Sequence, residues 1–324
     1  MIRKLLVPLA AALFTLTLPG AVAAQAPAAS VSEVAELATR FDPPLDKPLR
    51  YKLTQENVRD GKTESSVLEQ EVTYTRGSEG VVMTLRPLRL TTGGTAIDLT
   101  DPKAPLPPVL KLLTAPVAFD LDGDGSIVRV RGWEDYKRNL IASIPAMVAI
   151  SEPDLAKRPQ TERIIRNFFG KYAETSAEDA PHLVAKGWPE VLDVMGISAP
   201  AGEWMETETE ETIALFPEPI GYTITLKMDQ LPGGALRIEM TSVPDPAELK
   251  AAIVGMAESM RKSAPPDLPM RALDPEEQLA SMDLTMTMVV DLDARTGLVR
   301  RAVTERNIKT GDKKALDRIT IEAM

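Results

Sequence analysis

Residues 284–292 read LTMTMVVDL, in which every second side chain is apolar. This alternation has the period of a β-strand that turns one face to a core and the other to polar surroundings. Two further runs of the same kind follow the turns at Thr296-Gly297 and Gly311-Asp312. Parallel strands buried on both faces would read as continuous apolar runs. Residues 284–324 therefore predict a three-stranded antiparallel meander.

The same period recurs on both sides of a helical region. Alternating runs cover 49–54, 65–75 and 81–90, and later 220–228 and 236–240. Between them, residues 133–196 change to helical spacing, and a further helix is expected at 246–262. We expect an α+β fold in which one curved antiparallel sheet, like half a barrel, has its concave face covered by the helical block 133–196.

The expected domain organisation is a single α+β domain over residues 25–324. An alternative boundary lies near residue 200, where Ala199-Pro200-Ala201-Gly202 is typical of a linker. Residues 32–41 are expected to form a short helix before the first strand.

The N-terminus carries the most specific pattern of the chain. Arg3 and Lys4 precede an apolar run over residues 5–18, and small residues lead up to Ala24. This is the pattern of a signal peptide over residues 1–24, because a membrane-spanning helix needs about 20 apolar residues. We expect a soluble mature protein in the periplasm, without a transmembrane span after cleavage.

Composition excludes several kinds of chemistry. The chain of 324 residues has no Cys and one His, and its 47 acidic against 37 basic side chains give a formal net charge of −10. These counts exclude disulfides, thiolate nucleophiles and metal centres built from several His or Cys. The basic residues are scattered, so no nucleic-acid partner is expected.

One acidic stretch resembles a calcium loop. Asp120, Asp122 and Asp124 alternate, and a glycine follows in the sixth position. The twelfth position holds Arg131 where a bidentate Glu belongs, and a second Asp-Leu-Asp at 291–293 has Arg295 in the place of Asp124. Both stretches are therefore interpreted as hairpin turns, with a weak calcium site at Asp120, Asp122 and Asp124 as the alternative. No other cofactor is expected.

Methionines recur on the expected core faces. Thioether side chains adapt to irregular apolar ligands, so these residues are candidate ligand-binding positions, with ordinary core packing as the alternative. They are Met83, Met228, Met240, Met256, Met260, Met286 and Met288.

Enzymatic activity is uncertain, and its absence is the favoured interpretation. His182 near a helix start is accompanied by no convincing nucleophile motif, so we interpret it as a surface or helix-cap residue. Paired carboxylates remain open, because their separation cannot be read from a sequence. The acidic run 203–211 alternates with Thr207 and Thr209, which indicates an exposed strand face.

Taken together, these strands resemble a known style of protein. The chain has Y-x-L-T-Q at 51–55, a D-x-D-G hairpin that runs into Gly132-Trp133-Glu134, and T-G-L-V at 296–299. It resembles uncharacterised, β-rich exported proteins of Gram-negative bacteria, in families of unknown function. Its layout is similar to the half-barrel of the lipoprotein carriers LolA and LolB. The first resemblance implies no known activity, and the second implies an apolar passenger. The helical block is larger than that of the carriers, and no functional residue is transferred.

We therefore expect a soluble, non-enzymatic binding or envelope-maintenance protein of the periplasm that holds an apolar ligand such as a lipid. Two alternatives stay open. One is a protein–protein interaction module that contacts an envelope protein through the acidic strand or a sheet edge. The other is a carboxylate-dependent hydrolase of envelope glycans.

Overall fold

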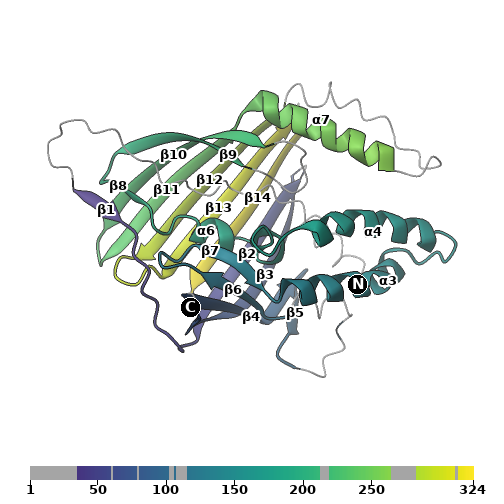
Figure 1. Ribbon diagram of the computed structural model, residues 1–324, viewed down its shortest axis with the longest axis horizontal. Coiled ribbons are helices and arrows are strands. Elements are labelled where there is room, and N and C mark those ends of the chain that lie inside the picture. The colour runs from purple at the N-terminus through teal and green to yellow at the C-terminus, as the bar shows by residue number, and fades with distance from the viewer. Residues whose placement is uncertain are drawn as a thin grey trace.

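The computed structural model describes residues 35–59, 61–78, 80–101, 106, 115–211, 219–263, 282–310 and 313–324. The signal peptide expected at 1–24 lies outside these residues. The described part is β-rich and is built on one large antiparallel sheet that does not close into a barrel (Figure 1).

The main sheet contains twelve strands. Its N-terminal strands are β2 (Leu49–Arg59), β3 (Lys62–Arg76), β4 (Val81–Thr92), β5 (Thr95–Asp98), β6 (Val117–Leu121) and β7 (Ile127–Arg131). Its C-terminal strands are β9 (Trp204–Glu211), β10 (Ile220–Leu231), β11 (Ala235–Pro244), β12 (Met282–Asp293), β13 (Val299–Thr310) and β14 (Lys313–Ala323). Their order is β7-β6-β4-β3-β2-β14-β13-β12-β11-β10-β9, and β5 pairs with β4. The predicted C-terminal meander is confirmed as β12–β14.

Two meanders join where the first strand of one pairs with the last strand of the other. β2 lies antiparallel to β14, with Tyr51 opposite Ala323 and Arg59 opposite Ala315. Strands from opposite ends of the chain thus lie side by side in the middle of the sheet (Figure 1).

The two faces of the sheet differ in the way the alternation predicts. On β12, Leu284, Met286, Met288 and Val290 are buried, whereas the residues that alternate with them, at 285, 287 and 289, are half-buried. We call the face with the buried side chains the inner face. The outer face carries ion pairs such as Arg318 with Glu305 and Arg86 with Glu71. Exposed pairs contribute about 0–1 kcal/mol each, so burial on the inner face supplies most of the stability.

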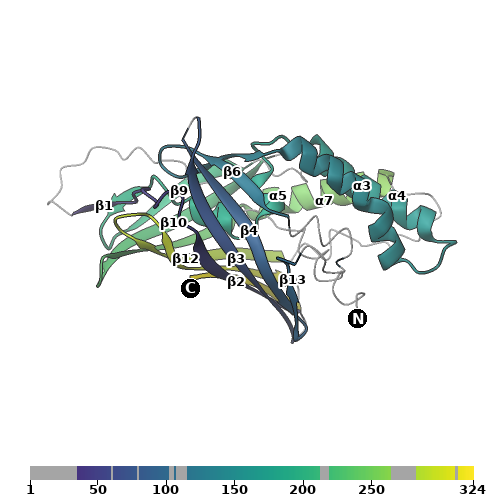
Figure 2. The same cartoon turned by 90° about the horizontal axis from the view of Figure 1, so that it is seen from below.

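The helical region divides into two parts. Helices α3 (Trp133–Ser151) and α4 (Arg158–Glu174) pack on each other around a small cluster that includes Ile144 and Phe169. They project beyond the sheet (Figure 2). Among their described side chains, those that reach the main core are Trp133 and Tyr136, in the first turn of α3. The short helices α5 (Pro181–Val184) and α6 (Trp188–Leu192) contribute buried side chains to that core. Cover of the concave face by the whole block 133–196 is therefore not confirmed.

Helix α7 (Pro246–Ser263) is confirmed close to its expected bounds and connects β11 to β12. Asp245 caps its start, because one carboxylate oxygen accepts hydrogen bonds from the backbone N–H groups of Ala247 and Glu248. No described helix is both long and apolar enough to cross a membrane.

A segment over residues 36–46, which we call the N-terminal strap, runs across one end of the sheet. Its strand β1 (Glu36–Ala38) pairs with β8 (Ser198–Pro200), so the helix expected at 32–41 is wrong. The backbone N–H of Asp42 then donates to Thr296 O, and that of Asp46 donates to Tyr74 O.

The strap lies against the turn between β12 and β13. Gly297 has φ +70°, and a Cβ at this position would lie 1.9 Å from the carbonyl oxygen of Arg40. Gly93 has φ +55°, but a Cβ there would meet nothing within 4 Å. The two glycines therefore differ in their contact with the strap.

Alanine substitutions at the two glycines should separate the cost of a left-handed backbone from the cost of displacing the strap. Gly93→Ala should cost about 1–2 kcal/mol for the left-handed conformation, and Gly297→Ala should cost about 1–3 kcal/mol more, because the strap must move. Urea unfolding measures the difference, and trypsin cleavage after Arg40 should accelerate only in Gly297→Ala. Equal effects of the two substitutions would contradict the close contact.

Candidate functional site

Charged side chains gather on the inner face, where α5 and α6 meet the middle of the sheet. Burial and mutual electrostatic interactions link these residues. The group, which we call the polar cluster, consists of His182, Lys186, Glu190, Arg59, Tyr222, Arg306 and Asp317.

The sheet positions one half of the polar cluster by strand register. Arg306 on β13 lies opposite Asp317 on β14, and both residues share the inner face with the buried Ile321. Arg59 of β2 donates to both carboxylate oxygens of Asp317, at 2.7 and 2.9 Å. The neighbour of Arg306 on its other side is Met286, so the cluster directly adjoins the apolar core.

The α5–α6 segment supplies the other half. Gly187 lies so close to β14 that a Cβ would be 2.9 Å from Ile319 Cγ2. The next residue, Trp188, packs edge-on against Tyr51, with 5.0 Å between the ring centroids. These two contacts hold Lys186 and Glu190 over β13 and β14.

Burial dominates the electrostatics of the cluster. It lowers the pKa of Lys186 from 10.5 to about 8. The charge of Arg306 lowers this pKa further, whereas the charges of Asp317 and Glu190 raise it. Burial also lowers the pKa of Arg306, although the charges of Glu190 and Asp317 act to raise it. It lowers the pKa of His182 as well, although the charge of Glu190 acts to raise it.

Several polar atoms of this region have no hydrogen-bond partner among the described residues. They are His182 Nδ1, Trp188 Nε1 and Glu190 Oε2. Glu190 is only 6% exposed. Native proteins satisfy nearly all buried polar groups, so this concentration needs a specific explanation.

The polar cluster adjoins both fully and partly buried parts of the inner face. Met286, Met288 and Val290 on β12 are buried in the core. Ile308, two residues beyond Arg306 on β13, is only half-buried. Leu68, Leu90 and Ile97 are also half-buried, but they lie in the register row of Val290 and Ile321, four residues along the strands from Arg306 and Asp317.

The five candidate methionines whose side chains the structure describes lie in the core. Met240 and Met288 are directly opposite each other on β11 and β12, and Met286 is opposite Ser242. Met83 and Met228 are also fully buried. Met256 and Met260 belong to α7, but their side chains lie outside the described residues. A role of any of the seven in ligand binding stays a prediction.

The candidate calcium loop is a hairpin turn between β6 and β7. Asp122 Oδ1 accepts hydrogen bonds from the backbone N–H groups of Asp124, Gly125 and Ser126 at 2.9–3.0 Å. Asp120 pairs with Arg129 and Arg131. Burial alone would raise the pKa of Asp120, but these hydrogen bonds hold it below its usual value.

No three His, Asp or Glu side chains within the described ranges form a group that could hold a metal ion. The geometry around Asp120, Asp122 and Asp124 thus gives the calcium prediction no support, and each turn contact is explained without an ion.

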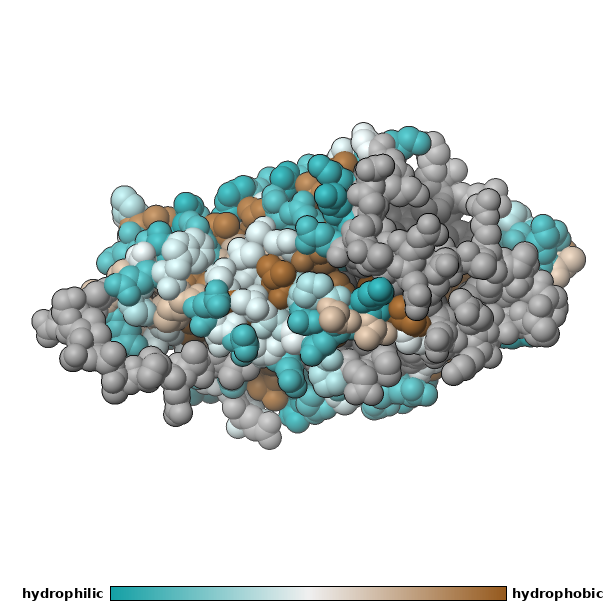
Figure 3. All heavy atoms as spheres, turned by 90° about the horizontal axis from the view of Figure 1, so that it is seen from above, coloured by the Kyte–Doolittle hydropathy of each residue, from teal (hydrophilic) through white to brown (hydrophobic). Residues whose placement is uncertain are grey.

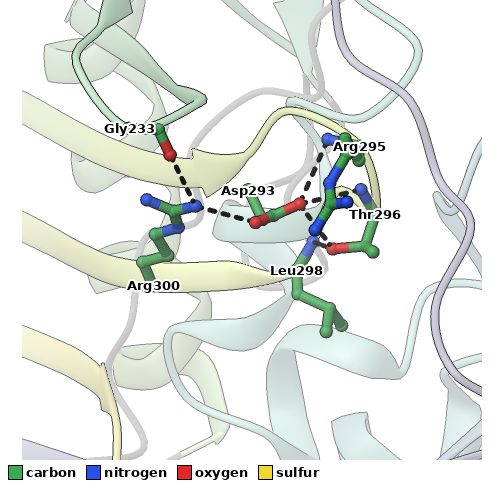
Figure 4. A network of polar contacts seen from close by, with 6 residues as sticks. All are labelled: Gly233, Asp293, Arg295, Thr296, Leu298 and Arg300. Atoms are coloured by element: carbon green, nitrogen blue, oxygen red, sulfur yellow. Dashed lines mark hydrogen bonds and ion pairs between the residues drawn. The ribbon is translucent and has the colours of Figure 1, made fainter.

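The turn between β12 and β13 uses the same chemistry. Asp293 Oδ1 accepts from the backbone N–H groups of Arg295 and Thr296, and Oδ2 accepts from Arg300 at 2.7 Å (Figure 4). Both turns follow an irregular step in strand register at Asp-Leu, between Asp120 and Leu121 and between Asp291 and Leu292. The interpretation of the two Asp-Leu-Asp stretches as hairpins is confirmed.

The acidic strand is also confirmed. It forms β9 at the end of the main sheet, where Glu206, Glu208 and Glu210 are exposed and Thr207 and Thr209 are half-buried. Trp204 at its start is 58% exposed. Seen from above, the described surface is mainly hydrophilic, and apolar side chains reach it in the middle of this face (Figure 3).

Most of the polar cluster was missed by sequence reasoning. His182 was interpreted as a surface or cap residue, whereas its Nδ1 is buried. The sequence of β13 does indicate one member of the cluster. Arg306 alternates in step with Ala302 and Ile308, whose apolar side chains belong to the inner face. A charge in the inward phase of a strand marks a buried ionic site.

Comparison with known proteins assigns no family. No family model matches the chain, and no curated protein matches it. Among solved structures, a porin-like protein from Bacteroides uniformis has 9% identity and a TM-score of 0.21 over 88% of this chain and 100% of its own. MucB in complex with MucA(peri) has 10% identity and a TM-score of 0.13, over 85% of this chain and 88% of that chain. Similarities at this level carry no argument about fold or function.

The carboxylate of Asp293 should stabilise the fold in a pH-dependent way. The hydrogen bond from Arg300 is the main cause that lowers its pKa from 3.8 to about 2. Its contribution is therefore complete above about pH 4 and is lost as the pH falls through about 2. Asp293→Ala should cost about 1–2 kcal/mol at pH 7, as for a lost cap. Urea unfolding between pH 2 and 7 tests this, with exposed Asp283→Ala as the control. If the difference in unfolding free energy between the wild type and Asp293→Ala does not shrink in acid, the expected role of the carboxylate is contradicted.

Lys186 should instead destabilise the fold at neutral pH. Its pKa of about 8 lies below 10.5, so the unfolded chain binds more protons above pH 8 and the fold gains stability as the pH rises. Lys186→Met should therefore stabilise the protein at pH 7 by about 1–3 kcal/mol, since one pKa unit corresponds to about 1.4 kcal/mol.

Urea unfolding at pH 7 and pH 9.5 measures this effect. The advantage of Lys186→Met over the wild type should shrink at pH 9.5, and Lys309→Met, an exposed position on β13, should change little. A destabilised Lys186→Met at pH 7 would show that Lys186 is a structural ion-pair partner.

Proposed function

We propose that this chain is an exported binding protein that holds a small ligand at the polar cluster, on the inner face of its sheet. The observation that carries the proposal is the buried Glu190 carboxylate, whose Oε2 has no hydrogen-bond partner among the described residues. Ligand groups that hydrogen-bond with Glu190, His182 and Trp188 would satisfy these atoms.

A structural role explains the cluster less well. Buried ion pairs are seldom more stabilising than apolar side chains of similar size, and a partly satisfied network is worse than an apolar core. The neighbouring position on β12 is already apolar, at Met286. Binding sites commonly retain polar groups that cost stability, because ligand contact compensates them.

The proposed location is the periplasm, and the proposal does not involve catalysis. The location rests on the basic and apolar pattern of residues 1–24. The half-buried side chain of Ile308, two residues from Arg306 on β13, supports a ligand with an apolar part.

A co-purifying ligand is the expected result of isolating the protein gently. The mature protein is purified from its own periplasm and studied by native mass spectrometry, followed by solvent extraction. We expect a bound small molecule in the wild type and in the control Lys309→Met, with lower occupancy in Lys186→Met. A wild-type protein without any bound species would contradict the proposal.

The same preparation tests the rival function of a protein–protein interaction module. The exposed Glu206, Glu208 and Glu210 favour a basic protein partner along β9. A bound protein that dissociates as salt rises, with no small molecule, would favour this rival.

A further inference from the structure

The two ends of the main sheet differ in their backbone hydrogen bonds. At one end, β7 is bonded to a segment outside the sheet, because the backbone N–H of Val130 donates to Ala177 O at 2.9 Å. At the other end, β9 pairs with β10 alone among the described strands. No backbone group of β9 bonds to any other described segment. A strand in this position presents a row of N–H and C=O groups with which a further strand can pair.

The hydrogen bonds of β10 show which residues of β9 carry these groups. Gly221 O accepts a hydrogen bond from the backbone N–H of Asp245 at 2.7 Å, so Gly221 is bonded on the side of β11. Gly221 lies opposite Glu210. Hydrogen-bonded and non-hydrogen-bonded pairs alternate along two antiparallel strands. Glu206, Glu208 and Glu210 therefore direct their N–H and C=O groups away from β10, along what we call the β9 edge.

The side chains of the same three residues give the β9 edge a negative charge. Glu206, Glu208 and Glu210 are exposed on one face of β9, and they make no hydrogen bond or ion pair with another described residue. Residues two apart on a strand are separated by about 7 Å, so these carboxylates repel one another. Thr207 and Thr209, which alternate with them, are half-buried on the opposite face. The edge is therefore complementary to cations at the spacing of alternate strand residues.

Trp204 distinguishes the β9 edge from an edge that is only protected against pairing. Charged side chains on an edge strand normally prevent aggregation. Here a 58% exposed Trp at the start of the strand adds a large apolar surface, of the kind that anchors protein partners. A second copy of the chain is not suited to the edge, because two antiparallel β9 strands would bring glutamates opposite glutamates.

We propose that the β9 edge binds an extended, basic polypeptide segment of another protein, which adds a strand to the sheet and places Lys or Arg opposite Glu206, Glu208 and Glu210. The basic residues of the segment then recur at every second position, and β-branched or apolar residues between them continue the face of Thr207 and Thr209. Main-chain hydrogen bonds supply affinity, and the alternate side chains supply specificity. The inference goes beyond the proposed binding of a small ligand and does not depend on it.

Synthetic peptides test the charge and the backbone separately. The probe is Thr-Lys-Val-Lys-Val-Lys-Thr with capped ends, and Lys-Lys-Lys-Thr-Val-Val-Thr has the same composition without the alternation. Two further probes are N-methylated, either at two Lys, whose N–H groups would face β9, or at the two Val, whose N–H groups would face away. Binding to the mature protein is measured by calorimetry and by the fluorescence of Trp204, because Trp133 and Trp188 are only 2% and 1% exposed.

We expect the alternating peptide and its Val-methylated form to bind at least about tenfold more tightly than the other two peptides. Their affinity should fall as the salt concentration rises. Glu208→Lys should weaken the binding of the alternating peptide at least about tenfold, because it places like charges opposite each other. The matched control Glu64→Lys changes an exposed residue of β3, which pairs with β2 and β4, and should leave the affinity unchanged. Circular dichroism shows whether each variant is folded.

The other outcomes overturn the inference. Equal affinities of the alternating and rearranged peptides, or of the two methylated forms, would show that charge alone attracts the peptide and that no strand is added. Binding that responds neither to salt nor to Glu208→Lys would exclude a role of the carboxylates. If no peptide binds, the edge accepts no basic segment, and if the peptide instead dissociates a dimer in ultracentrifugation, the edge belongs to a second copy. The mass spectrum of the protein from the periplasm decides the proposed small-ligand function separately.

Discussion

The hydrogen-bonded pairing of β2 with β14 is the constraint on which the rest of the structure depends. Within each half of the chain the neighbouring strands of the sheet follow one another in sequence, and among the described strands the pairing of β2 with β14 is what joins the two halves into one sheet. It also places Arg59 beside Asp317, so the sheet half of the polar cluster exists only when both ends of the chain are in register. A slip of β2 by one residue against β14 would put Arg59 and Asp317 on opposite faces of the sheet.

The inner face combines two environments that oppose each other energetically. Buried Leu, Val, Ile and Met side chains stabilise the sheet, whereas the ionisable groups beside them resist burial. The α5–α6 segment brings the two together, since Trp188 packs on the core while Glu190 lies in the cluster. Under the binding function that we propose, a ligand would compensate the charges retained at this boundary.

The sequence predicts those parts of the fold that depend on local periodicity. The alternation in 284–292 and in the acidic run 203–211 identifies strands and their faces, because every second residue records the same environment. The turns at 120–126 and 291–298 could be predicted, because an Asp side chain caps its own turn. Strand β1 could not, since its conformation depends on pairing with β8, which lies about 160 residues later in the chain.

The candidate site was less predictable than the fold for the same reason. Lys186 and Asp317 look like ordinary surface residues in the sequence, and Arg306 alone of the three is marked by its phase on β13. Only the tertiary arrangement of α5–α6, β13 and β14 brings them together. The seven methionines were conspicuous because they are rare side chains on regular faces, yet the five whose side chains are described lie in the core. Regular patterns reveal packing, whereas sites assembled from separate elements leave little trace in any one of them.

The position of the N-terminal strap has a consequence for the order of folding. Its residues Arg40 and Phe41 lie against turns at Gly125 and Gly297, and the second turn belongs to the last meander of the chain. When the chain emerges from its N-terminus, the strap and β2 must wait for their partners until nearly all residues are available. Such distant contacts are slow to form. Until then the edge of β2 that pairs with β14 and the apolar inner face stay uncovered, so this topology disfavours folding during synthesis.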